Sequence, residues 1–258
     1  MNNPLTGARY LLRGFQLIIR PGIRRYVFIP LAINTVLFIT VIWFGIGQFG
    51  ELTDWIFGFL PTWLQEWLAW LRWIFYVLFG LLMLLVVFFT FTLVANIIAA
   101  PFNDLLSAAV TRHLALANAA PSESTTQHKT PDTAFIKQFM PLIANELKKL
   151  SYFILWSIPF LLLFLVPVVN LIAPLLWFLF TAWMLNLEYM DYPMGRDNLL
   201  FSQQRKRLKP HKFLSLGFGS AVSLTTMIPI ANFLVIPAAV AGATALWIEQ
   251  LENKTTPT

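Results

Sequence analysis

The segment with the clearest chemical potential is a short basic turn near the N-terminus, with the sequence Arg20-Pro-Gly-Ile-Arg-Arg. Its Pro-Gly pair ends any preceding helix, and a new helix can begin at Ile23. The first turn of a helix offers unpaired backbone N–H groups and positive potential, and guanidinium groups donate paired hydrogen bonds to oxyanions. The candidate ligands for sulfate or phosphate are Gly22, Ile23, Arg24 and Arg25. Alternatively, these arginines only contact lipid phosphates.

Two further polar clusters could contribute to an ion path through a membrane. One contains Glu188, Asp191 and Arg196, directly after an apolar stretch, and the other contains Asn103 and Asp104. A charged side chain in hydrocarbon must pair with another group or face water, so such residues often mark a path for ions. Each cluster could equally be a solvated segment at the membrane surface.

Signatures of catalysis and of metal binding are absent from the sequence. It contains no G-x-x-x-x-G-K-[ST], H-E-x-x-H or G-x-S-x-G motif and no cysteine. The histidines His113, His128 and His211 lack the spacing of metal ligands. We therefore expect a protein that is not an enzyme and that binds no metal and no cofactor.

The composition indicates that most of the chain lies in lipid. Of its 258 residues, 58% are hydrophobic and only 12% are charged, whereas soluble domains have about 25% charged residues. The formal net charge of +6 comes from arginines and lysines that cluster between apolar runs, which indicates membrane topology and argues against a nucleic-acid partner. We predict an all-α integral membrane protein that consists of a single membrane domain, residues 1–258.

The N-terminal half is expected to contain two long transmembrane helices. Residues 5–20 have the pattern of an amphipathic helix, and residues 23–50 are long enough for a first span. Residues 74–117 are predicted to form a second span that continues into the cytoplasm. Residues 121–132, rich in Ser, Thr and Pro, are expected to form an exposed loop.

The C-terminal half contains two apolar stretches of similar design, residues 152–187 and 213–248, and each has a Pro-x-x-Asn break near its middle. The arm at residues 152–166 would reach about 22 Å as a helix, which is less than the roughly 30 Å of a hydrocarbon core. We therefore predict two re-entrant (hemi-penetrating) hairpins. Four thin or tilted full spans are the alternative.

The basic residues that flank the first span and the hairpins fall on one side of this arrangement, which predicts a multi-pass membrane protein with both termini in the cytoplasm. They are Arg9, Arg13, Arg20, Arg24 and Arg25 near the first span, and Lys148, Lys149, Arg196, Arg205, Lys206, Arg207, Lys209 and Lys212 beside the hairpins.

Four motifs, in the same order along nearly the whole chain, resemble the CysZ family of bacterial sulfate permeases. They are the basic turn at residues 20–25, Ala-Pro-Phe-Asn-Asp at 100–104, Tyr-Met-Asp-Tyr-Pro-Met at 189–194, and the Pro-x-x-Asn segment at 229–232 with its continuation to 244. The resemblance implies an inner-membrane protein that imports sulfate for cysteine biosynthesis. It also implies two long transmembrane helices, two hemi-penetrating hairpins and homo-oligomers surrounded by membrane lipids.

In this family a Gly-Leu-Arg segment at a helix start binds the oxyanion. The resemblance transfers that role to Gly22, Ile23, Arg24 and Arg25, with Ile23 in place of the usual leucine. Two other classes of function stay open at this stage. One is a membrane scaffold or assembly factor without transport activity, and the other is a lipid-modifying enzyme that would use Glu188, Asp191 and Arg196.

Overall fold

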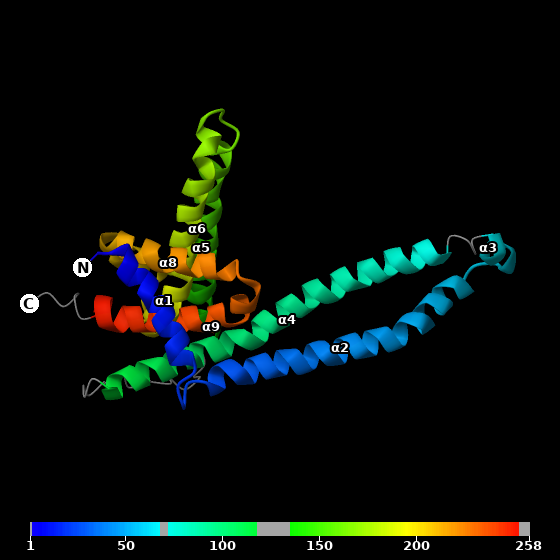
Figure 1. Ribbon diagram of the computed structural model, residues 1–258, viewed down its shortest axis with the longest axis horizontal. Coiled ribbons are helices and arrows are strands. Elements are labelled where there is room, and N and C mark those ends of the chain that lie inside the picture. Colours follow the sequence, from blue (N-terminus) through cyan, green and yellow to red (C-terminus); the bar gives the residue numbers. More distant parts are fainter. Residues whose placement is uncertain (1, 68–71, 118–134, 253–258) are drawn as a thin grey trace, which may run out of the picture. The chain divides into compact units, whose positions relative to one another are not determined.

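The computed structural model of the protein describes residues 2–67, 72–117 and 135–252, and all regular secondary structure within these ranges is helical (Figure 1). The chain divides into two compact units. One unit is Tyr26–Phe102, and the other combines Met1–Arg25 with Asn103–Thr258. The predicted loop at residues 121–132 lies outside the described residues.

The unit Tyr26–Phe102 consists of long apolar helices. It contains nearly all of α2 (Arg25–Gly58), the short α3 (Thr62–Trp67) and the first part of α4 (Arg72–Ala117). The 46 residues of α4 correspond to about 69 Å of helix, which is more than twice the thickness of a hydrocarbon core. Large apolar side chains on α2 and α4 point outward, as expected for helices whose solvent is lipid.

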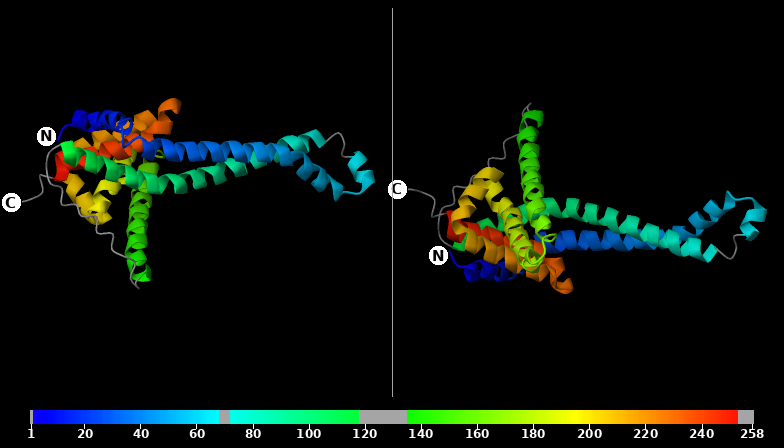
Figure 2. Two further views of the ribbon diagram at one scale, coloured as in Figure 1. Left: turned by 90° about the horizontal axis from the view of Figure 1, so that it is seen from below. Right: turned by 90° about the horizontal axis from the view of Figure 1, so that it is seen from above.

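In the other unit, α1 (Pro4–Ile18) packs across α8 (Lys212–Thr226) and α9 (Pro229–Leu246), as Figures 1 and 2 show. Glycines on both sides of this interface let the backbones of α1 and of its partners α8 and α9 approach closely. A Cβ added at Gly7 would collide with the carbonyl oxygen of Leu214, and one at Gly14 with that of Ala238. Such close approach through small residues is typical of helix packing in membranes.

The first predicted hairpin corresponds to α5 (Phe135–Leu163) and α6 (Ala173–Arg196), joined by a turn that includes η1 (Val169–Leu171). Their interface contains a cluster of aromatic rings, in which Phe153, Phe160 and Trp177 surround Phe180 at centroid distances of 5.7, 4.9 and 5.7 Å. Further along, α6 packs against α8 and α9. The segments α7 (Phe201–Leu208) and η2 (Lys209–His211) then connect it to α8.

Three helical segments among the described residues are long and apolar enough to cross a membrane: Arg25–Gly45, Val94–Ala117 and Ala231–Leu251. In the part of the chain that the structure describes, the protein is therefore an all-helical membrane protein, which confirms the coarser part of the prediction, the all-α membrane class. The third segment combines most of α9 with a π-helical turn, η3 (Trp247–Leu251), and overlaps the second part of the second predicted hairpin, residues 213–248. Length and composition alone therefore permit α9 to span the membrane.

Candidate anion-binding site

The predicted anion site lies in the turn between α1 and α2. Ile23 anchors the turn, because its side chain is only 2% exposed. Gly22 has φ +87°, a backbone conformation that residues other than glycine rarely adopt. The helix α2 begins at Arg25, later than the expected start at Ile23, so residues 19–24 form a separate turn between the two helices.

The turn uses part of its own backbone donor capacity. The N–H groups of Ile23 and Arg24 both donate to the carbonyl oxygen of Arg20, at 3.1 and 3.0 Å. The N–H of Gly22 has no hydrogen-bond partner among the described residues. The side chains of Arg24 and Arg25 are exposed. An anion here would therefore meet the Gly22 N–H and the two guanidinium groups, and not the full set of backbone donors that the sequence suggested.

The helix before this turn, α1, is fixed by a polar network with residues of η3, which follows α9. The Tyr10 hydroxyl donates to Glu249 at 3.0 Å and accepts from Gln250 at 3.1 Å, and Arg13 forms an ion pair with the same Glu249 carboxylate. Burial of the ring, together with the nearby Glu249 carboxylate, raises the pKa of Tyr10, so that its hydroxyl stays protonated. These contacts, with the glycine interface, hold the helix that leads into the basic turn.

A second polar network connects α5, α6 and α7. The ammonium group of Lys149 lies 2.6 Å from Asp191, 3.3 Å from Glu146 and 4.0 Å from Glu188. The fully buried Gln204 donates from Nε2 to the other oxygen of Asp191 at 2.6 Å. One lysine thus faces three carboxylates, and Asp191 accepts two short hydrogen bonds.

The titration behaviour of this network follows from its burial and its charges. Burial opposes the charge on Lys149, but the carboxylates of Asp191, Glu188 and Glu146 together outweigh this effect, and the pKa of Lys149 is raised. Partial desolvation raises the pKa of Glu188, although 57% of its side chain is exposed; Lys149 opposes this rise, and the carboxylates of Asp191 and Glu146 add to it. Lys149 therefore stays charged at neutral pH, and Glu188 binds a proton more readily than a glutamate without these neighbours.

The structure brings together only some of the five predicted path residues. Glu188 and Asp191 share Lys149, as described above. Asn103 is buried and donates to the hydroxyl of Tyr192 at 3.4 Å, whereas Asp104 is exposed. Arg196 has a buried Nη1 atom without a hydrogen-bond partner among the described residues.

Comparison with known proteins identifies the relatives of this chain. Residues 10–237 match the family described as sulfate transporter CysZ/etoposide-induced protein 2.4. The chain belongs to this family.

Several bacterial relatives are similar to the CysZ-family chain along almost its whole length. The Pseudomonas fluorescens strain Pf-5 protein named sulfate transporter CysZ is 44% identical over 246 residues, which cover 95% of this chain and 94% of the relative. The protein of the same name from Pseudomonas syringae pv. tomato is 41% identical, with 95% and 93% covered. The one from Pectobacterium atrosepticum is 38% identical over 255 residues, with 96% and 86% covered.

Sequence reasoning missed several polar residues that the structure of this CysZ-family member brings together. Lys149 was placed only as a basic residue beside a hairpin, although Glu146 at i−3 is a local sign of pairing. Gln204 and Glu249 gave no local signal, because their partners lie on other helices. Within the described residues, no group of three His, Cys, Asp or Glu side chains could hold a metal ion.

Proposed function

We propose that the protein is a sulfate permease of the bacterial inner membrane that supplies sulfate for cysteine biosynthesis. The observation that carries this proposal is the basic turn, which combines an unpaired Gly22 N–H with two exposed arginines inside a chain about 40% identical to proteins named sulfate transporters. Guanidinium groups and backbone N–H groups are the donors that tetrahedral oxyanions prefer in proteins.

Sulfate capture is assigned to Gly22, Ile23, Arg24 and Arg25, with unequal roles. Two backbone N–H groups are already bonded to Arg20, so the guanidinium groups of Arg24 and Arg25 supply most of the donors. Ile23 contributes by anchoring the turn through its buried side chain. A dehydrated sulfate needs several donors at once, and a second copy of the chain in a homo-oligomer could provide more of them.

The five polar residues on α4 and α6 are proposed to lie along the path that sulfate takes after capture. Lys149 gives this path a cationic group between Glu188 and Asp191. It offsets one of the three carboxylate charges around it and so reduces the repulsion that an anion would meet. The partly buried Arg196, together with Asn103 and Asp104, supplies further polar groups.

We propose that the two hairpins enter the membrane without crossing it. The apolar part of α6, from Ala173 to Leu187, is about 22 Å long, short of the roughly 30 Å core. The hairpin tip is apolar, with Val168 and Leu171 each 80% exposed. Most N–H groups of residues 164–172 are hydrogen-bonded within the turn, as hydrocarbon requires. This arrangement leaves both termini on the cytoplasmic side, where the basic residues gather.

The proposal is tested by uptake of radiolabelled sulfate into liposomes that contain the purified protein. The variant is the double substitution Arg24→Ala with Arg25→Ala, and the matched control is Lys206→Ala with Lys209→Ala, which removes two exposed charges elsewhere. Uptake by the parent and the control, with loss in the arginine variant, supports both transport and the capture site. Equal uptake by all three proteins places capture elsewhere, and no uptake by the parent favours a membrane scaffold.

A further inference from the structure

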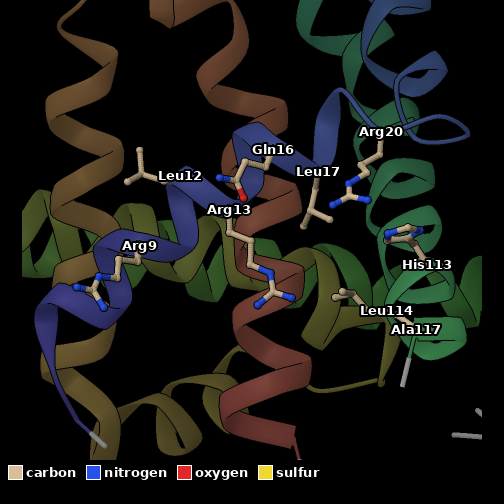
Figure 3. A pocket seen from close by; sticks show the side chains of 9 residues that line it. All are labelled: Arg9, Leu12, Arg13, Gln16, Leu17, Arg20, His113, Leu114 and Ala117. Atoms are coloured by element: carbon tan, nitrogen blue, oxygen red, sulfur yellow. The ribbon is translucent and has the colours of Figure 1, made fainter. Parts of the chain in front are cut away.

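A cavity of about 640 Å³ lies beside α1, on the side that carries its polar residues (Figure 3). It involves α1, the start of the turn that follows, and the end of α4, all within one compact unit. It contains none of the four residues assigned to sulfate capture. The lining residues are Arg9, Leu12, Arg13, Gln16, Leu17, Arg20, His113, Leu114 and Ala117.

The polar lining of this cavity is cationic. Arg9, Arg13 and Gln16 follow one another at spacings of four and three residues, which places them along one side of α1, and Arg20 follows in the turn after this helix. No aspartate or glutamate is among the described residues that line the cavity. Glu249 pairs with Arg13, but neither Arg9 nor Arg20 has an acidic partner within 4 Å among the described residues. Two guanidinium charges are therefore available to a ligand.

The cavity also has apolar walls and is too large for sulfate alone. Its volume falls in the range of about 300–1,000 Å³ that accommodates small organic molecules. Leu12 is 63% exposed at its rim, and Leu17 and Leu114 form part of the wall. Figure 3 shows Arg20 and His113 on the same side of the cavity, with Leu17 and Leu114 close to them. The matching ligand combines an oxyanion with an apolar body.

We propose that this cavity binds an anionic phospholipid, whose phosphate group lies at Arg20 with Gln16 and His113 as further hydrogen-bonding groups, while the charge of Arg9 at the other end of the cavity attracts the same headgroup. Basic pockets on the cytoplasmic side of membrane helices bind acidic lipid headgroups. A free phosphate or sulfate ion has the same oxyanion chemistry, but it would leave the apolar walls unused. The lipid would hold α1 at the membrane surface through a site separate from sulfate capture.

The test uses the purified full-length protein in an uncharged detergent, titrated with fluorescent phosphatidylglycerol. The variant Arg9→Gln with Arg20→Gln should bind this lipid roughly 30-fold more weakly, a loss of about 2 kcal/mol, since each basic residue near an anionic lipid contributes about 1 kcal/mol. The control Lys206→Gln with Lys209→Gln removes the same charge from exposed positions outside the cavity and should stay within about threefold of the parent. Size-exclusion chromatography checks that each variant is folded.

Additional arms distinguish a bound lipid from a free ion and from a general effect of surface charge. Fluorescent phosphatidylcholine, which has no net charge, should bind weakly to every variant. The variant Arg9→Lys with Arg20→Lys keeps the charges and should recover much of the binding of phosphatidylglycerol, so a loss in the glutamine variant cannot be attributed to misfolding.

Equal weakening by the cavity and control variants would show a general surface-charge effect and overturn the proposal. Binding of labelled sulfate or inorganic phosphate that depends on Arg9 and Arg20, without preference between the two lipids, would overturn it in favour of a free-ion site. The readout counts bound lipid, so it can fail while sulfate uptake succeeds, and the reverse.

Discussion

Replacing Gly14 by alanine tests whether the glycine interface holds α1 in place. A Cβ at Gly14 would overlap the carbonyl oxygen of Ala238 and lie 2.9 Å from the backbone nitrogen of Gly242. Both neighbours are backbone atoms of α9 and cannot rotate away, so the two helices would have to separate. That separation would loosen the packing of Tyr10 and Leu11, which are 7% and 2% exposed.

The expected change in the free energy of unfolding follows from two opposing effects. Gly→Ala favours a helix by about 0.5–1 kcal/mol. Overpacking a tight interface costs about 1–3 kcal/mol, and a clash with backbone lies at the upper end or beyond, so a net loss of about 2 kcal/mol is expected for Gly14→Ala. For a chain of this size this loss corresponds to a Tm lower by roughly 4–8 °C.

Thermal unfolding of the detergent-solubilised protein, followed by intrinsic fluorescence, measures this change. The matched control is Gly195→Ala near the end of α6, where the nearest atom to an added Cβ is an Asp191 side-chain oxygen at 3.7 Å, an ordinary contact. The control should keep or slightly raise the Tm. If Gly14→Ala and Gly195→Ala melt together, the close packing of α1 on α9 is refuted.

Three further changes test other parts of the structure. Glu188→Gln should raise the Tm at pH 7 and leave it unchanged below about pH 4.5. A carboxyl group whose pKa is higher in the folded than in the unfolded protein lowers stability as the pH rises from the unfolded pKa through the folded pKa, and glutamine removes this loss. A lower Tm of the variant at pH 7 would contradict the raised pKa. Gly22→Ala should cost about 1–2 kcal/mol through its positive φ and lower sulfate uptake, whereas Gly45→Ala, which also has open space around it, should not reduce stability. Thr244→Val should lower the free energy of unfolding by about 1–3 kcal/mol, because it removes the 3.0 Å hydrogen bond to the buried Ser107 hydroxyl. A double variant with Ser107→Ala should recover part of this stability, and strictly additive losses of stability would argue against the bond.

The fold class and the family could both be predicted from the sequence, because composition and motif order are properties of the chain itself. The low charge content and the long apolar runs required helices in lipid, and the comparisons confirm the CysZ family. The expected second span covers residues 74–117, and the helix α4 covers Arg72–Ala117. An apolar run followed directly by helix-forming residues contains no signal that ends a helix, so the pattern predicts one continuous helix. Pro101 interrupts one hydrogen bond without ending the helix.

The packing of α1 could not be predicted in the same way. Its amphipathic pattern suggested a helix at the cytoplasmic face of a membrane, and the structure places one side of it against α8 and α9. Gly7 and Gly14 face partners more than 200 residues away in the chain, Leu214 and Ala238, and periodicity contains no information about such partners. The pairing of Lys149 with Asp191, 42 residues apart, was hidden for the same reason.

Within the candidate site, the sequence located the basic turn but not how its donors are used. A Pro-Gly break before two arginines suggested free N–H groups at a helix start, and this inference assumed that the helix begins at Ile23. The structure delays the helix to Arg25 and directs two N–H groups to the Arg20 carbonyl. Hydrogen bonding inside a turn depends on its dihedral angles, which residue types constrain only loosely, apart from a residue such as Gly22.

The attachment of α1 has a consequence for how sulfate capture could work. One side of α1 is fixed by backbone contacts to α8 and α9, and its Tyr10 and Arg13 are fixed by Glu249. The turn that follows is closed by its own hydrogen bonds and anchored by Ile23. The backbone of the proposed capture site is therefore ordered before an anion arrives, so within the protein binding has to order only the exposed arginine side chains. Loosening α1 with Gly14→Ala should then weaken sulfate binding even though Gly14 cannot touch the ion, whereas Gly195→Ala should leave it unchanged.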